Sequence, residues 1–137
     1  MRVSILTLNP GFFGGPLDEG MIRVAREKGL LEVMLVPIRA FAEDRYGTTD
    51  DYPYGGGAGM VMKSEPILAA HDSVVRAAGG AVPRTLITTP QGRVLTQEWV
   101  RELAAAPHLA VVCGRYKGID ERAVETLRAG GAEEFSI

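Results

Sequence analysis

The sequence predicts an α/β domain in which a parallel β-sheet is flanked by helices. Short apolar runs rich in β-branched residues recur along the chain. They lack the strict alternation of a half-exposed strand, and this is the pattern of strands covered on both faces. Segments with helical spacing of apolar residues lie between the runs. Strands that alternate with helices imply βαβ crossovers, and therefore a largely parallel sheet.

The predicted elements follow one another in a regular order. The strands are expected at Val3–Leu8, Leu31–Ile38, Thr85–Thr88, Leu109–Cys113 and Phe135–Ile137. The helices are expected at Asp18–Lys28, Glu65–Ala78, Gln97–Ala106 and Ile119–Arg128. Residues typical of helix ends support these bounds, since Ser64 and Thr96 are candidate N-caps and Gly29 is a candidate C-terminal cap.

The long polar segment 39–62 follows neither a helical nor a strand period. Segments of this kind longer than ~12–15 residues are usually functional or disordered. Its glycine cluster, Gly55–Gly59, fits a plain turn and a ligand-wrapping loop about equally well, but the stiff, charged approach Asp50–Tyr54 favours the functional alternative. A phosphate-binding P-loop is not formed, because Met62 stands where glycine should precede Lys63 and Ser64.

Composition limits the classes of function. The 137 residues carry a net charge of −2, which argues mildly against a strong non-specific nucleic-acid binder but leaves room for a local basic patch. A single cysteine allows no intrachain disulfide, and no repeated metal-ligand spacing occurs. Without a signal peptide or a run of ~18 apolar residues, we expect a cytoplasmic protein without a membrane span.

Two further motifs directly follow predicted strands. Thr88–Gly92 comes after the third strand and Cys113–Arg122 after the fourth, so both are expected at the sheet edge where open α/β sheets bind ligands. The simpler alternative for the first motif is a tight turn. Cys113 fits a small buried residue better than a nucleophile. Two histidines, His71 and His108, are expected at the surface, and Trp99 in the core.

These motifs together resemble those of bacterial tRNA (guanine-N1)-methyltransferases, the TrmD family of the SPOUT superfamily. Asp44–Asp51 with Pro53–Met60 resembles the signature loop of the family, and Thr89–Gly92 resembles its Ser-Pro-Gln-Gly. Cys113–Arg122 resembles its Cys-Gly-Arg-Tyr-Glu-Gly-Ile-Asp-Glu-Arg. The resemblance covers the whole chain, with the three motifs in the same order.

The resemblance implies a SPOUT domain over residues 1–137, with 39–62 as a functional loop inside it. It implies a homodimer that transfers the methyl group of S-adenosylmethionine to N1 of the guanosine immediately 3′ of the anticodon in tRNA. The cofactor residues it implies are Ile87, Thr88, Thr89, Pro90, Gly114, Tyr116, Ser136 and Ile137. The residues expected to face tRNA are Asp50, Gly59 and Arg115.

The chain also departs from the family. The general base of the family is an aspartate in a segment expected beyond Ile137, so no catalytic residue is assigned here and we expect an incomplete trefoil knot and an inactive, truncated fragment. No metal ligand is assigned. Lys117 replaces the glutamate of the family, which places a role for magnesium in doubt because an ammonium cannot ligate a cation. The alternative function is a non-catalytic RNA-binding or dimerisation module that retains the pocket.

Overall fold

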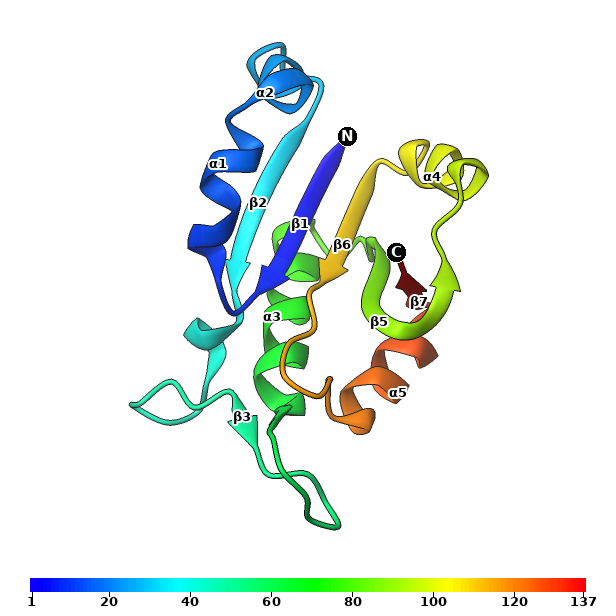
Figure 1. Ribbon diagram of the computed structural model, residues 1–137. Coiled ribbons are helices and arrows are strands. Elements are labelled where there is room, and N and C mark those ends of the chain that lie inside the picture. Colours follow the sequence, from blue (N-terminus) through cyan, green and yellow to red (C-terminus); the bar gives the residue numbers. More distant parts are fainter.

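The computed structural model describes residues 1–137 and contains a five-stranded parallel sheet (Figure 1). The strand order is β2-β1-β6-β5-β7, and every neighbouring pair runs parallel. The strands are β1 (Arg2–Thr7), β2 (Glu32–Pro37), β5 (Arg84–Val94), β6 (His108–Val112) and β7 (Glu133–Ser136). The predicted parallel sheet flanked by helices is therefore confirmed.

The helices follow the predicted order, and one short helix that was not predicted precedes them. The main helices are α2 (Gly20–Glu27), α3 (Ser64–Ala77), α4 (Gln97–Ala104) and α5 (Glu121–Ala129). A 3₁₀ turn, η1 (Pro10–Phe13), and the short helix α1 (Gly14–Leu17) precede α2. The predicted helix at 18–28 starts late because Gly20 adopts a φ of +56°, which breaks the right-handed path. The structure contains no helix that is both long and apolar enough to cross a membrane.

Capping explains where the helices begin and end. Thr96 caps α4 by accepting a hydrogen bond from the Trp99 amide, as the sequence predicts. Gly29 lies just past α2 with a φ of +69°, in agreement with its predicted capping role. The N-cap of α3 is Lys63 rather than the predicted Ser64, a shift of a single residue.

The segment 39–62 contains only short elements. It begins within the 3₁₀ turn η2 (Ile38–Phe41), and it pairs β3 (Asp50–Asp51) with β4 (Val61–Met62) as a minimal antiparallel ladder. A two-residue ladder has no hydrophobic period long enough to be recognised, which explains why the sequence gives no signal for it.

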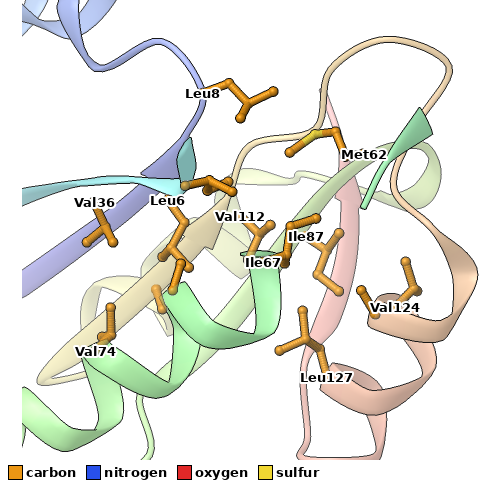
Figure 2. Packing of buried hydrophobic residues seen from close by; sticks show 14 residues of the cluster. Leu6, Leu8, Val36, Met62, Ile67, Val74, Ile87, Val112, Val124 and Leu127 are labelled. Atoms are coloured by element: carbon orange, nitrogen blue, oxygen red, sulfur yellow. The ribbon is translucent and has the colours of Figure 1, made fainter. Parts of the chain in front are cut away.

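Side chains on the two faces of the sheet form separate cores. The larger core packs α3 and α5 against one face, and Figure 2 shows side chains of the sheet meeting those of both helices. The smaller core packs α4 against the other face around Trp99, which is fully buried as predicted. Neighbouring residues on β5 take part in different cores, since Ile87 belongs to the larger and Leu86 to the smaller. The sheet is therefore covered on both sides, as its continuous apolar strands require.

The strand β5 bends around β7, as Figure 1 shows. Thr88 and Arg93 both pair with Phe135, so the residues between them form an arch beside that position. Gly92 lies so close to β7 that an added Cβ would stand 2.4 Å from the backbone nitrogen of Phe135. The arch therefore requires glycine at this position, and the motif that the sequence presents as a turn is part of a strand.

Replacing Gly92 with alanine is expected to destabilise the fold by about 3 kcal/mol, because the clash is with backbone that cannot rotate away. The matched control is Gly14→Ala, since nothing lies within 4 Å of the added Cβ and the glycine is helical. Urea unfolding of both variants checks this. Equal stability of Gly92→Ala and the wild type would show that β5 and β7 are not in close contact.

Both histidines are half-buried and hydrogen-bonded, so the prediction of surface histidines is wrong. The Nε2 atom of His71 lies 2.8 Å from the Thr85 hydroxyl, and that of His108 lies 2.9 Å from the Ser4 hydroxyl. Burial lowers the pKa of both rings, and the nearby Arg2 lowers that of His108 further. The hydroxyl groups of Thr85 on β5 and Ser4 on β1 account for the positions of the two rings. Both partners are distant in the sequence, so the residues around each histidine do not predict them.

The stability of the fold is expected to decrease as the pH falls below 6.5, because the unfolded chain then binds protons that the two folded histidines resist. Well above that pH both histidines are neutral in the folded and the unfolded chain, and this loss of stability is absent. Urea midpoints between about pH 7.5 and 5.5 measure this, a window above the carboxylate pKa values. The double variant His71→Gln and His108→Gln should show a flatter profile. An unchanged slope in that variant would contradict the assignment.

Candidate functional site

The arch of β5, the loop after β6 and the end of β7 surround a cleft of about 710 Å³. Both strand-end motifs and the end of the chain contribute to its wall. Every residue that the resemblance implies for the cofactor lines it: Ile87, Thr88, Thr89, Pro90, Gly114, Tyr116, Ser136 and Ile137. The structure thus brings together positions that are up to fifty residues apart in the sequence.

A hydrogen bond joins the two motifs that line the cleft. The amide of Gly114 donates to the Thr88 hydroxyl at 2.8 Å. A Cβ at Gly114 would stand 3.1 Å from the Thr88 carbonyl oxygen, so the close approach of the two loops depends on glycine. The arch of β5 and the loop after β6 are therefore held in a fixed relation to one another.

The turn after Gly114 places a bulky residue in an unusual backbone conformation. Tyr116 has a φ of +60°, and it is the only residue other than glycine with a positive φ. The Gly118 amide closes this turn by donating to the Arg115 carbonyl at 3.2 Å. Left-handed conformations of such residues cost energy and occur preferentially at ligand sites, where the surroundings impose them. The conformation of Tyr116 is consistent with a binding role for this turn.

The glycine-rich segment reaches back to the same turn. The Lys117 amide donates to the Met60 carbonyl at 3.0 Å, and the Met62 amide donates to the Gly118 carbonyl at 3.0 Å. Gly59 has a φ of +102°, and the stem of Lys117 packs against its Cα. The segment 39–62 therefore docks onto the third motif by its C-terminal end.

The three residues predicted to face tRNA surround this junction. Asp50 lies on β3 and pairs with Met62, while Gly59 contacts Lys117. Neither lines the cleft, whereas Arg115 does. The Arg115 guanidinium donates to the Asn9 side-chain carbonyl. Arg115 thereby separates the main cleft from a second cleft of about 630 Å³ formed with Leu8–Phe12.

Sequence reasoning missed part of this surface. Leu8–Phe12 follows β1 at the same sheet edge. Its position directly after a predicted strand could have indicated that it contributes to the binding surface. Gln91, Glu121 and Glu134 also line the main cleft. Gln91 and Glu121 lie within the two motifs, and Glu134 lies just before the predicted strand at Phe135–Ile137. The sequence does not indicate which polar side chains of these segments line the cleft.

Local electrostatics are dominated by an exposed pair. Arg122 donates to Asp120 at 2.8 Å and keeps the pKa of that carboxyl below its usual range. The same guanidinium lies 5.8 Å from the ring of Tyr54 in the glycine-rich segment. Burial raises the pKa of the Cys113 thiol, which disfavours the nucleophilic thiolate and agrees with a structural role. No group of three or more His, Cys, Asp or Glu side chains is placed to hold a metal ion.

Comparison with known proteins gives one consistent result. The family model described as tRNA (Guanine-1)-methyltransferase TrmD matches residues 1–137. A tRNA (guanine-N(1)-)-methyltransferase of Chloroflexus aurantiacus is 54% identical over 93% of this chain and 50% of its own length. The enzyme of the same description from Geobacillus kaustophilus is 45% identical over the whole chain and 54% of its own length.

A solved structure agrees with the sequence comparisons. The crystal structure of tRNA (m1G37) methyltransferase from Aquifex aeolicus superposes with a TM-score of 0.83 at 41% identity. The match covers 91% of this chain and 56% of that one. The chain spans about half the length of the curated relatives that it matches.

Gly59→Ala is expected to loosen the junction between the glycine-rich segment and the third motif, because the added Cβ would stand 2.7 Å from Cε of Lys117. Hydrogen exchange at the Lys117 amide, which donates to Met60, should become faster. Gly57→Ala is the matched control, since its φ of +110° imposes similar strain with nothing near the added Cβ. Equal protection of Lys117 in both variants would refute a specific contact.

Proposed function

The chain belongs to the tRNA (guanine-1)-methyltransferase family, and from this premise we propose that it forms the cofactor-binding part of such an enzyme. The proposed reaction transfers the methyl group of S-adenosylmethionine to N1 of the guanosine immediately 3′ of the anticodon in tRNA. The observation that carries the proposal is the convergence of both strand-end motifs and of β7 on one cleft. The C-terminal end of the glycine-rich segment meets the same turn.

The cleft fits S-adenosylmethionine. Its volume of about 710 Å³ lies within the usual range for small-molecule sites. The side chains of Pro90 and Ile137 are apolar and exposed and offer surfaces for an adenine ring, and the hydrogen bond from Gly114 to Thr88 holds the next loop close to β5. When bound, the cofactor supplies an electrophilic methyl group on its sulfonium sulfur.

Methylation at guanine N1 requires more than a methyl donor. The nitrogen carries a proton at neutral pH, so a base must accept this proton as the bond to carbon forms. Because N1 takes part in base pairing, the guanine must be presented unstacked or from a loop. We assign Asp50, Gly59 and Arg115 to the side that faces tRNA, and the general base to the aspartate that the family carries C-terminal to the region matched here.

A homodimer is part of the proposal, supported by an apolar surface on α2. No residue of α2 is buried, although one side of the helix is apolar. Met21 is 78% exposed and Ile22 is 40% exposed. An amphipathic helix usually buries its apolar side, so a second subunit is a suitable partner for it. A cytoplasmic location is part of the same proposal, because the proposed substrate is tRNA.

A second candidate function is a non-catalytic RNA-binding or dimerisation module. Lys117 favours it, because the charge at that position is opposite to that of the glutamate in the family motif. Binding of S-adenosylmethionine separates the two candidates, since a relic pocket has no need to bind the cofactor.

The protein in its full natural length is expected to transfer labelled methyl groups from S-adenosylmethionine to tRNA that carries guanosine 3′ of the anticodon. Replacing that guanosine with adenosine should abolish the incorporation, because adenine has no N1 proton to lose and presents an amino group in place of O6. Nucleoside analysis of the product identifies the methylated atom. Equal methylation of both transcripts would refute the substrate assignment.

A further inference from the structure

Two charged side chains of the main cleft have neither an ion pair nor a side-chain hydrogen bond. Lys117 and Glu121 both line the cleft and are exposed. Neither has an oppositely charged side chain within 4.0 Å of its charged atoms. Among the charged side chains that line the cleft, one cation and one anion therefore have no polar contact with another side chain, while Arg115 is hydrogen-bonded to Asn9.

The other charges of the cleft are already engaged. Glu134 pairs with Arg128 at 3.3 Å, and the Arg115 guanidinium donates to Asn9. Asp120, next to Glu121 in sequence, is held by Arg122. A ligand with both a positive and a negative group would therefore find Lys117 and Glu121 as its free partners.

The positions of these two side chains are fixed by the backbone. Lys117 follows the left-handed Tyr116, its amide is held by Met60, and its stem rests on Gly59. Glu121 is the first residue of α5, which begins at the side-chain cap of Asp120. Residues 114–119 and Glu121 therefore line the cleft together with residues of β5 and β7.

We propose that Lys117 binds the carboxylate and Glu121 binds the ammonium group of the amino-acid end of the cofactor. This inference rests on the proposed function. If the adenosine lies against the exposed side chains of Pro90 and Ile137, the amino-acid end extends toward residues 116–121. A zwitterion requires one partner of each sign, and the cleft offers one free partner of each.

Charge-assisted hydrogen bonds to partly exposed groups are worth about 1 kcal/mol, which corresponds to roughly fivefold in affinity. Lys117→Ala is therefore expected to weaken binding of S-adenosylhomocysteine roughly fivefold. Binding of 5′-methylthioadenosine, which has the adenosine but no amino-acid end, should not change. Decarboxylated S-adenosylhomocysteine, which keeps the ammonium, should also bind the variant and the wild type equally.

Further substitutions of Lys117 and Glu121 test which group of the cofactor each side chain binds. Lys117→Arg should retain most of the affinity, and Lys117→Glu should weaken binding of S-adenosylhomocysteine more than alanine does, because it repels the carboxylate. Glu121→Gln should weaken binding of both S-adenosylhomocysteine and its decarboxylated analogue, but not of methylthioadenosine. Lys28→Ala is the matched control, since Lys28 is an exposed lysine at the end of α2, outside the cleft. Isothermal titration calorimetry on the protein in its full natural length provides the readout.

The possible results separate this inference from the proposed function. If the wild type binds neither S-adenosylhomocysteine nor methylthioadenosine, both proposals fail. If the wild type binds S-adenosylhomocysteine and Lys117→Ala binds it equally well, the carboxylate assignment fails while the proposed function stands. If Lys117→Ala binds the cofactor as the wild type does but binds tRNA more weakly, the carboxylate assignment fails, and the Lys117 side chain instead contacts an RNA phosphate. Retained binding of methylthioadenosine shows that each variant is folded.

Discussion

The pairing of β7 with both limbs of β5 is the constraint on which the site depends. Thr88 on one limb and Arg93 on the other meet the same residue, Phe135. The residues of the arch between them line the cleft, and so do Ser136 at the end of β7 and Ile137 after it. The Gly114 amide then ties the next loop to Thr88. The close approach of Gly92 to Phe135 keeps this arch of β5 against β7.

Much of the fold could be predicted from the sequence, because the strands are continuous apolar runs and the helices carry ordinary caps. Thr96 and Gly29 perform their predicted roles. The short helix α1 was missed because its sequence, Gly14-Gly15-Pro16-Leu17, consists largely of poor helix formers. The arch of β5 was missed because Pro90 and Gly92 are typical of turns, and its course depends on a strand some forty residues later. Long-range pairing of this kind leaves no local pattern.

The candidate site was predicted from motifs and from the rule that ligands bind at the carboxyl edge of such sheets. The structure gathers the predicted cofactor residues around one cleft, although their contacts with a cofactor stay a prediction. Asn9 was overlooked because its partner Arg115 is distant in sequence. The chain as a whole is acidic, yet Arg115 and Lys117 lie together at the cleft. The distribution of charge is therefore more informative about binding than the net charge.

The arch around β7 also affects how the protein is made. A ribosome adds residues in order, at about 5–20 per second, and domains begin to fold as they emerge. The strands β1, β2, β5 and β6 can pair before β7 leaves the exit tunnel, because β7 is the last strand of the sheet to be synthesised. During that interval the inner edge of β5 has no partner and is available to other nascent chains. The cleft is therefore the last part of this region to form, and chaperone protection would matter most at that stage of translation.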